Sequence, residues 1–529
     1  MKNKQFCLIV LMLMIVATII PLAGTAIKNN VPCMTKPGIQ WEKTYGGELI
    51  DWGNCIQKTS DGGYIISGTN FRNAWSLWYS YFYLIKIDSN GNEEWHQIFG
   101  EYNSEHDIKS VQQTTDGGYI LAGYQGVTFE YDAIVHKTDS EGNIVWSCTF
   151  GDPDKYDAAR SVQQTSDGGY IVTGMTKSYG AVGTDALLIK LDSNGAEEWI
   201  NTLGAAGQDA GYCVRQTSDG GFIVVGESDS FGNYSGDVYL VKTDSSGNEE
   251  WNQTYGDAQW DGGYCVDVTS DGGYIITGWH NNEDYNSDVF LIKTDSSGKE
   301  EWSQLYGGSD YDEGYSVQET SDGGYFITGL YTDPENYDPD VYLIKTDDSG
   351  NEEWSKKIDN GNTEDVGNYG IETSYNEYIV AGYTGFYIEE VMDVWVIKLG
   401  GSNHAPNAPT IDGPTSVKKG TEYNYTFQAT DFDRDEIYYC IDWGETFSNE
   451  EWIGPFTSGD KINVSHSFIG KGTYTIKAKV KDSSDAESDW GTLEVNVPRA
   501  TNTHYSLIQL LLEKFPNAFP FLRYLLGFL

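Results

Sequence analysis

The sequence predicts an all-β chain in which a four-stranded unit is repeated seven times and a smaller β-sandwich follows. The first observation is a decapeptide, TSDGGYIITG at 269–278, whose close copies start at residues 59, 114, 165, 217 and 320. The second is composition, because Tyr (38), Gly (61) and Trp (16) are abundant and Pro (13) is sparse, which favours short strands joined by glycine turns. The third is a tryptophan that recurs at steps of 51 to 54 residues: Trp41, Trp95, Trp146, Trp199, Trp251, Trp302 and Trp354.

Each unit contains four strand segments in a fixed order, as in EEWSQLYGG, GYSVQET, YFITG and DVYLIKTD of one copy. A degenerate seventh copy follows Trp354, with YNEYIVAG at 375–382 and DVWVIKLG at 393–400. Repeats of about 50 residues with four antiparallel strands are typical of a β-propeller. Residues 38–400 are therefore predicted to form a seven-bladed propeller of four-stranded blades. The first segment, around Trp41, is predicted to complete the last blade and close the ring, beside the strands near 367–399.

Two repeated features are interpreted as scaffold. The Asp-Gly-Gly turns contain glycines, such as Gly62 and Gly63, that are expected to supply positive φ, while the aspartate bonds its own backbone. The Asp-Ser-Asn-Gly turns are interpreted as hairpins and not as calcium loops, because their glycine comes too early. A lysine present in every unit is likewise assigned to the scaffold: Lys86, Lys137, Lys190, Lys242, Lys293, Lys345 and Lys398.

Residues 1–26 have the pattern of a signal peptide. Lys2 and Lys4 precede an apolar stretch from Phe6, and small residues follow at Gly24 and Ala26. Export to an extracellular or cell-surface location is therefore predicted, and an uncleaved membrane anchor is the alternative.

The charge is strongly acidic, with 79 Asp and Glu against 33 Lys and Arg and a net charge of −46. Electrostatic repulsion argues against nucleic acid or an anionic membrane as the partner of the main body. Cations are the natural counterpart, and a well-solvated acidic surface is the simpler explanation.

No cysteine after the signal belongs to a C-x-x-C pair. Cys55, Cys213 and Cys265 occupy a repeat position where Ser110 and Ser161 stand in other units. They are interpreted as small buried residues and not as a disulfide framework.

The composition changes after residue 400. Residues 401–408 are predicted to be a linker, and 409–498 a small β-sandwich. The tail at 503–529 is apolar, but Pro516 and Pro520 interrupt it, which argues against a transmembrane helix. Short amphipathic helices that contact a membrane or an assembly partner are expected there.

In these motifs, residues 38–400 resemble the Trp/Asp-Gly-Gly propeller repeats of secreted and surface proteins of archaea and bacteria, and more distantly quinoprotein propellers. The second domain resembles PKD and immunoglobulin-like domains in DWGE at 442–445, HSF at 466–468 and GTYTIKAKVKD at 472–482. It departs from the usual pattern at Glu445 and Thr446. The resemblance implies a spacer or adhesion role for this domain.

No catalytic constellation emerges from the sequence. The repeat region has only three arginines, Arg72, Arg160 and Arg215, and its histidines are scattered without a nucleophile partner. We therefore predict a non-catalytic surface binding or adhesion protein. The alternative is a propeller enzyme, either a quinone-dependent oxidoreductase or a glycan hydrolase or lyase.

A site on a repeated ring must break the repeat, so ligand-binding residues are sought where the copies differ. Acids that open the variable loops, such as Asp51, Asp107 and Asp157, recur and are expected to brace turns. Aromatic residues within the variable stretches do not recur, and they suit a glycan or a protein partner. For Trp75 and Trp78, packing against their own blade is the alternative. The candidate ligand-binding residues are Trp75, Trp78, Tyr79, Trp279, Tyr285, Tyr331 and Tyr337.

A calcium site is the one cofactor hypothesis. Asp431, Asp433 and Asp435 alternate in DFDRDE, and Asp482 follows a strand that could return to the same end of the sandwich. A solvated acidic turn is the alternative.

Overall fold

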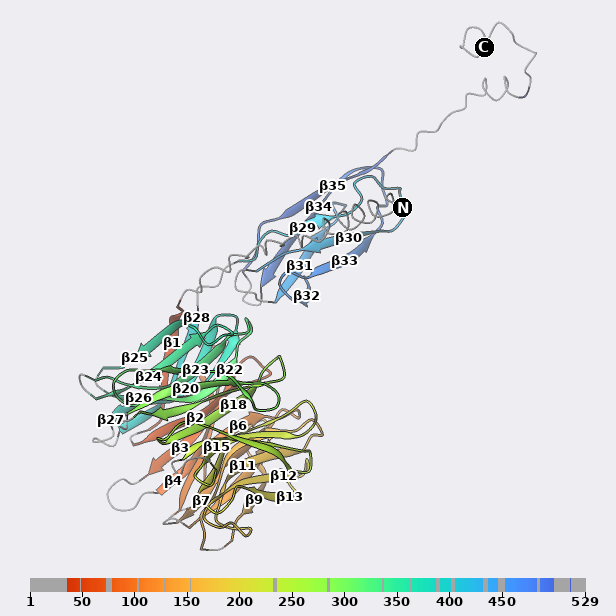
Figure 1. Cartoon of the computed structure of the whole chain (residues 1–529). Helices are drawn as coiled ribbons and strands as arrows, with labels where there is room; N and C mark the ends of the chain where they lie inside the picture. The colour runs from red at the N-terminus through yellow and green to blue at the C-terminus, as the bar shows by residue number, and fades with distance from the viewer. Residues whose placement is uncertain are drawn as a thin grey trace, which may run out of the picture. The chain divides into compact units, whose positions relative to one another are not determined.

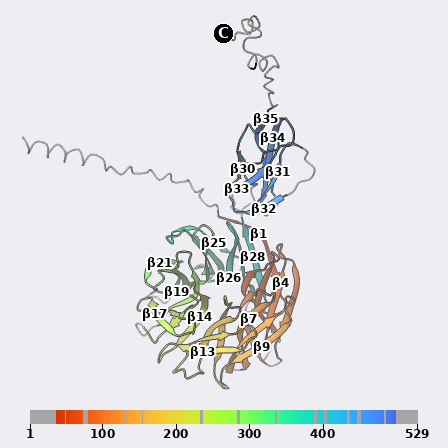
Figure 2. The same ribbon diagram turned by 90° about the vertical axis from the view of Figure 1, so that its right-hand side faces the viewer.

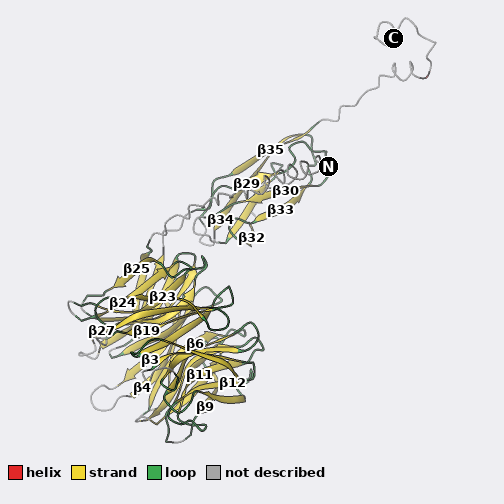
Figure 3. Cartoon of the chain, viewed as in Figure 1, coloured by secondary structure: helices red, strands yellow, loops and turns green. Residues whose placement is uncertain are grey.

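The computed structural model describes most of the chain, and strands dominate it (Figures 1 and 3). The described residues are 36–47, 49–72, 79–101, 104–127, 130–152, 154–231, 236–282, 286–334, 337–361, 363–386, 391–400, 405–431, 436–445, 452–482, 486–498 and 514. Among these residues no helix is both long and apolar enough to span a bilayer. The all-β prediction is confirmed for the described part of the chain.

Residues 38–400 form seven antiparallel sheets of four strands, numbered here from sheet 1 to sheet 7. Sheet 1 consists of β2 (Asp51–Lys58), β3 (Tyr64–Arg72), β4 (Tyr79–Ile87) and β5 (Glu93–Phe99). Sheet 2 consists of β6 (Glu105–Gln113), β7 (Tyr119–Val127), β8 (Glu130–Thr138) and β9 (Ile144–Phe150). Sheet 3 consists of β10 (Asp157–Gln164), β11 (Tyr170–Thr176), β12 (Asp185–Leu191) and β13 (Glu197–Leu203). Sheet 4 consists of β14 (Asp209–Gln216), β15 (Phe222–Ser228), β16 (Asp237–Thr243) and β17 (Glu249–Tyr255). Sheet 5 consists of β18 (Asp261–Val268), β19 (Tyr274–Asn281), β20 (Ser287–Thr294) and β21 (Glu300–Tyr306). Sheet 6 consists of β22 (Asp312–Glu319), β23 (Tyr325–Thr332), β24 (Pro339–Thr346) and β25 (Glu352–Ile358). Sheet 7 consists of β1 (Gly38–Tyr45), β28 (Val391–Gly400), β27 (Glu377–Phe386) and β26 (Glu364–Ser374), in that order.

Sheet 7 combines strands from both ends of the repeat region. β1 pairs antiparallel with β28 from Gly38↔Gly400 to Tyr45↔Val394. The Asn368 Nδ2 atom of sheet 7 donates to the Gly53 carbonyl of sheet 1 at 2.8 Å. The equivalent bond, from Asn54 to the Ile108 carbonyl, joins sheets 1 and 2 at 2.8 Å. The last and first sheets are thus joined like two consecutive sheets, and Figure 2 shows successive sheets around a common centre.

The recurring tryptophans pack each sheet against the next one. Trp95 of sheet 1 lies over a turn of sheet 2, so that a Cβ atom on Gly142 would come within 2.6 Å of its ring. Its ring centroid also lies 6.0 Å from that of Tyr119, the first residue of β7. The same packing places Trp41 of sheet 7 on Gly91 of sheet 1. The tryptophan repeat is therefore a spacer between sheets.

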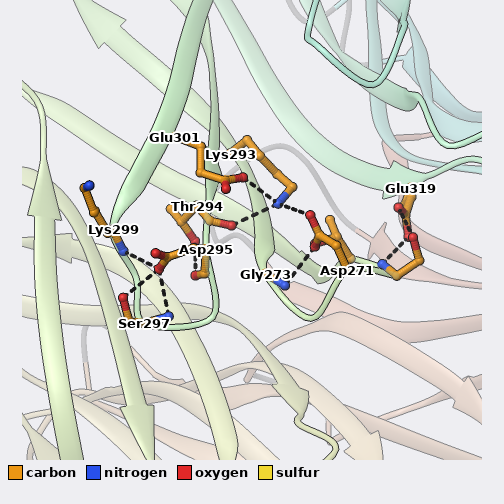
Figure 4. A network of polar contacts seen from close by, with 11 residues as sticks. Asp271, Gly273, Lys293, Thr294, Asp295, Ser297, Lys299, Glu301 and Glu319 are labelled. Atoms are coloured by element: carbon orange, nitrogen blue, oxygen red, sulfur yellow. Dashed lines mark hydrogen bonds and ion pairs between the residues drawn. The ribbon is translucent and has the colours of Figure 1, made fainter. Parts of the chain in front are cut away.

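The Asp-Gly-Gly turns hold a buried lysine, as Figure 4 shows in sheet 5. Asp271 accepts from the Gly273 amide at 2.9 Å and from Lys293 Nζ at 2.9 Å. The same ammonium donates to the Thr294 carbonyl at 2.9 Å and to Glu301 at 3.2 Å. Equivalent lysine–aspartate pairs occur in sheets 1 to 6, and Lys398 of sheet 7 pairs with Glu377 instead. The interpretation of these lysines as scaffold is confirmed.

The two glycines of this turn have different functions, which corrects the expectation that both supply positive φ. Gly272 has a φ of 85°, but Gly273 does not lie in the left-handed region. A Cβ atom on Gly273 would lie 2.1 Å from the Thr294 carbonyl oxygen and 2.7 Å from Lys293 Nζ. The second glycine is therefore needed for space, because the lysine side chain ends there.

Three cysteines of the repeat region form no disulfide and link neighbouring sheets. The thiols of Cys55, Cys213 and Cys265 are buried, and each donates to a backbone carbonyl of the next sheet. In sheet 2, Ser110 Oγ takes this place and accepts from the Val162 amide at 3.3 Å. Their interpretation as small buried residues is confirmed.

Residues 410–497 form two further sheets that share one core. The strands are β29 (Thr410–Asp412), β30 (Tyr423–Gln428) and β33 (Lys461–His466) in one sheet, and β32 (Trp452–Phe456), β31 (Ile437–Asp442), β34 (Gly472–Asp482) and β35 (Gly491–Val497) in the other. Tyr425 and Phe427 of the first sheet pack with Tyr439 and Val480 of the second. The DWGE and HSF motifs, which carry the resemblance to PKD domains, are also in contact, since Trp443 stacks on His466 with ring centroids 4.2 Å apart.

Three predicted segments lie largely outside the described residues. They are the signal peptide at 1–26, half of the linker at 401–408, and the helical tail at 503–529, of which only Lys514 is described, as helical. Strands end at Gly400 and resume at Thr410, on either side of the predicted linker.

Candidate functional site

A cavity of about 610 Å³ lies among the first strands of all seven sheets. Its lining comes from β2, β6, β10, β14, β18, β22 and β26. The volume falls within the range usual for small-molecule sites, roughly 300–1,000 Å³.

Each of these first strands carries a β-bulge at the same place. Between Gly53 and Cys55, for example, the pairing with β3 skips Asn54. A bulge inserts one unpaired residue and re-aims its side chain, which is common beside binding sites. All seven bulged residues line the cavity: Asn54, Lys109, Arg160, Tyr212, Tyr264, Tyr315 and Asn368.

A glycine of the repeated decapeptide makes room for the bulge. A Cβ atom on Gly68, the last residue of TSDGGYIISG, would lie 1.8 Å from the Trp52 carbonyl oxygen. The equivalent glycines of the other six sheets face a carbonyl of the bulged strand at 1.7 to 1.9 Å. This constant glycine is the signal in the sequence that could have located the cavity. The bulged residue that accompanies it is the variable one.

Three consecutive bulges form an aromatic wall. Tyr212 and Tyr264 have ring centroids 5.6 Å apart, and Tyr264 and Tyr315 are 5.4 Å apart. Glu227 accepts from the Tyr212 hydroxyl at 2.8 Å, and Glu313 is hydrogen-bonded with Tyr315 and Tyr264. Burial, followed by these carboxylates, raises the pKa of all three phenols well above the usual value. They are therefore neutral, oriented hydrogen-bonding groups and not nucleophiles.

The opposite arc of the cavity is polar. Lys109 forms an ion pair with Asp107 at 2.6 Å, and Asp107 also accepts from Asn54 at 2.8 Å and from Thr69 at 2.6 Å. Although burial opposes it, Lys109 and these donors lower the pKa of Asp107. The charge of Lys109 is therefore paired within the protein.

A hydrogen bond crosses the cavity between sheets 4 and 7. Arg215 donates from Nη2 to the Tyr369 hydroxyl at 3.2 Å and from Nη1 to the Val214 carbonyl at 2.9 Å. Its Nε atom lies 3.9 Å from Asp267. Arg215 is therefore occupied by protein groups.

Arg160 is different. It lines the cavity from β10, and its Nε atom is buried without a hydrogen-bond partner. Its guanidinium lies over the Tyr124 ring, 5.8 Å from the centroid. No carboxylate of the described residues forms an ion pair with it.

The predicted ligand residues lie elsewhere. Trp75, Trp78 and Tyr285 fall outside the described residues, and Tyr79 is the first residue of β4. Tyr337 is a loop residue with 70% of its surface exposed. Neither Tyr79 nor Tyr337 lines the cavity.

Trp279 and Tyr331 are strand residues, which corrects their assignment to variable loops. Trp279 pairs with Gly262 and Val289, and its indole lies beside the Tyr264 hydroxyl. Tyr331 is covered by Lys357, whose Nζ lies 3.0 Å from the ring centroid. The hairpins extend further into the variable stretches than the sequence pattern indicates, because strand pairing continues past the constant glycine.

The loop-opening acids do brace turns. Asp51 accepts from the Gly47 amide at 2.8 Å, and Asp209 from the Ala205 amide at 2.8 Å. In sheet 2 the residue equivalent to Asp51 is His106, whose Nε2 atom accepts a hydrogen bond from the Glu101 amide at 3.1 Å. Asp107, assigned to this series by the sequence, instead pairs with Lys109 at the cavity.

Two clusters of the described residues place their ligand atoms within 4.8 Å of one another, as a metal site would: Asp257, Asp261 and His280, and Asp340, Asp359 and Asp365. His280 forms an ion pair with Asp261 at 2.6 Å. A carboxylate cluster by itself identifies no ligand. Of the predicted calcium ligands, Asp433 and Asp435 fall outside the described residues, whereas Asp431 and Asp482 are buried.

Two groups of aspartates with shifted pKa values predict that the folded protein is most stable at an intermediate pH. Burial, reinforced by neighbouring aspartates, raises the pKa of Asp51, Asp312 and Asp340 to about 6. A raised pKa in the folded state costs stability as pH rises from about 4 through 6. Conversely, hydrogen bonds and a lysine outweigh burial and lower the pKa of Asp61 and Asp271 to about 2. Their contribution is present above pH ~4 and lost as pH falls towards 2.

We therefore expect the melting temperature of the full chain to be highest near pH ~4–5, lower at pH ~7.5, and to drop steeply below pH ~3. Scanning calorimetry across buffers measures this. Asp312→Asn should flatten the decline between pH ~5 and ~7.5. A melting temperature that rises steadily from pH ~5 to ~8 would contradict the assignment.

Comparison with solved structures finds a similarity in the second domain. The PKD domain of an M14-like peptidase from Thermoplasmatales archaeon SCGC AB-540-F20 is 50% identical over 18% of this chain and 100% of that domain, with a TM-score of 0.18. No protein-family model and no curated protein matches the chain.

Proposed function

We propose that this protein is an exported, non-catalytic surface protein whose seven sheets form a closed seven-bladed β-propeller that binds a glycan in its central cavity. Closure is supported by the β1–β28 pairing and by the Asn368 bond to Gly53. The signal-like segment at 1–26 supports export.

One observation carries the binding function. The position after the bulge, which links neighbouring sheets, is a small Cys or Ser in six of the seven sheets and Tyr369 in the last, whereas the bulged residues that line the cavity are Asn, Lys, Arg, Tyr, Tyr, Tyr and Asn in turn. A scaffold position of a repeated ring keeps its residue type, and a ligand without that symmetry requires different groups around the ring. Flat tyrosine faces beside amides and cations suit the apolar and hydroxylated faces of a sugar.

The rival is a propeller enzyme, with a quinone cofactor or with hydrolase or lyase activity. The neutral tyrosines argue for hydrogen bonding and against nucleophilic attack. Adding pyrroloquinoline quinone and calcium to the full chain and recording the absorption spectrum tests the oxidoreductase. A protein-bound cofactor spectrum would favour the rival.

A glycan array probed with the full chain tests the proposed function. We expect Tyr264→Ala to weaken binding about tenfold or more, because the wall loses its central ring. The matched control is Tyr337→Ala, which removes an exposed tyrosine that does not line the cavity. Loss of binding in Tyr337→Ala with retention in Tyr264→Ala would move the site to the loops.

For residues 409–498 we propose a PKD-like spacer that binds calcium. Asp431 and Asp482 are both buried, with 5% and 1% of their surfaces exposed, and carboxylate oxygens are the ligands that calcium prefers. The tail at 503–529 is proposed to contact a membrane or an assembly partner.

Calcium should raise the temperature of a thermal transition of the full chain, measured by calorimetry against magnesium at equal ionic strength. Asp433→Ala and Asp482→Asn should each abolish the shift, while Asp412→Asn, at an exposed strand end, should keep it. The absence of any calcium-dependent shift in the parent chain would refute the site.

A further inference from the structure

We propose that Arg160 binds the carboxylate of an acidic sugar, a hexuronate residue, within the central cavity. This inference rests on the proposed glycan-binding function and adds the class of sugar and the residue that selects it.

The position of Arg160 supports a ligand role. Its side chain leaves the sheet at the β-bulge of β10, between Ala159 and Ser161, and lines the cavity. Its Nε atom is buried without a partner, and its nearest described interaction is with the Tyr124 ring at 5.8 Å. A guanidinium offers five donors in a planar fork that matches a carboxylate.

The other cations of the cavity provide the contrast. Lys109 is paired with Asp107 at 2.6 Å, and Arg215 donates to Val214 and Tyr369. Arg160 alone among these three has neither an ion pair nor a hydrogen bond to a described residue. Keeping a buried charge unpaired costs stability. An anion supplied by a ligand would remove this cost.

The surroundings define which anion fits. Asp107 and Glu227 lie near enough to Arg160 for its charge to act on both carboxyls, although neither forms an ion pair with it; burial still raises the pKa of Glu227, whereas Lys109 and hydrogen bonds outweigh burial and lower the pKa of Asp107. A second negative charge on the ligand would meet these carboxylates, so a monoanion is favoured over a phosphate dianion. The tyrosine wall begins at Tyr212, in the sheet next to Arg160, and supplies flat surface for a pyranose ring. Asn54 and Asn368 supply amides to the same cavity.

Isothermal titration calorimetry on the full chain tests the proposal. The probes are glucuronate and galacturonate, the neutral sugars glucose and galactose, galactose 6-sulfate, and acetate. We expect at least one uronate to bind about tenfold or more tightly than its neutral counterpart. In Arg160→Gln the uronate should bind no better than the neutral sugar, whose own affinity should persist. Arg72→Gln, at an arginine of β3 that does not line the cavity, is the matched control and should keep the preference.

Thermal unfolding of Arg160→Gln adds a readout that separates binding from structure. Because Arg160 has no ion pair or hydrogen bond to a described residue to lose, the melting temperature of Arg160→Gln should be unchanged or raised. A large decrease, or a uronate preference that survives in Arg160→Gln, would overturn the assignment. Equal binding of galactose 6-sulfate would overturn the choice of carboxylate, and equal binding of acetate would overturn the sugar. If neutral sugars bind as tightly as uronates, this inference fails alone; if no sugar binds, the proposed function fails with it.

Discussion

Deletion of residues 27–46 should lower the melting temperature of the repeat domain by about 10 °C or more. The deletion removes β1, which forms the outer strand of sheet 7 through pairing with β28 along its whole length. It also removes Tyr45, which is buried and donates to the Gly91 carbonyl at 2.6 Å, and Trp41, which packs on the same turn of sheet 1. Loss of two packed aromatic side chains costs about 5 kcal/mol or more.

Scanning calorimetry or circular dichroism measures this difference. Deletion of residues 27–35 alone is the matched control, because it stops before β1 and should leave the melting temperature unchanged. A chain without residues 27–46 that melts like the parent would show that sheet 7 does not need strands from both ends, and would refute closure of the ring.

Lys345→Met should be more destabilising than the same substitution in any other sheet, by about 3–5 kcal/mol. The Lys345 side chain is fully buried and lies 3.1 Å from Asp322 and 3.0 Å from Glu353, whose side chains are only 13% and 31% exposed. Removing the ammonium leaves these carboxylates buried without their cation. Thermal unfolding of the purified variants measures the loss.

The repeat itself offers the control. Lys293→Met removes the same contacts from Asp271 and Glu301, but these side chains are 59% and 47% exposed and can be solvated by water. Its cost should be about 1–2 kcal/mol. Adding Asp322→Asn to Lys345→Met should restore part of the lost stability, since it removes one unpaired charge. Equal effects of Lys345→Met and Lys293→Met would mean that burial of the acids does not set the cost.

Much of the fold could be predicted because the repeat makes every strand visible several times. The spacing of Trp41 and Trp95 and the Asp-Gly-Gly turns marked the strand order, which the seven four-stranded sheets follow. The scaffold role of the lysines could be predicted because a lysine recurs in every copy, and the buried role of Cys55 because other copies have a small cysteine or serine at the same position.

The candidate site was largely missed. Sequence reasoning placed ligand residues in the most variable loops, where Trp279 and Tyr331 turned out to belong to strands. Arg160 and Tyr212 were overlooked because each stands within a strand whose pattern otherwise resembles a core strand. Alternation along a strand assigns side chains to two faces, and a bulge breaks that alternation locally.

The sequence alone determined the strand content, the repeat, the turn chemistry and the acidic charge, because these depend on residues close together in the chain. Only the tertiary structure decided that seven residues more than 50 positions apart, from Asn54 to Asn368, line one cavity, and that Asp107 neutralises Lys109 while Arg160 has no such partner. The physical reason is that burial and pairing of a charge depend on which strands become neighbours, and neighbouring strands from different sheets leave no mark in the local sequence pattern.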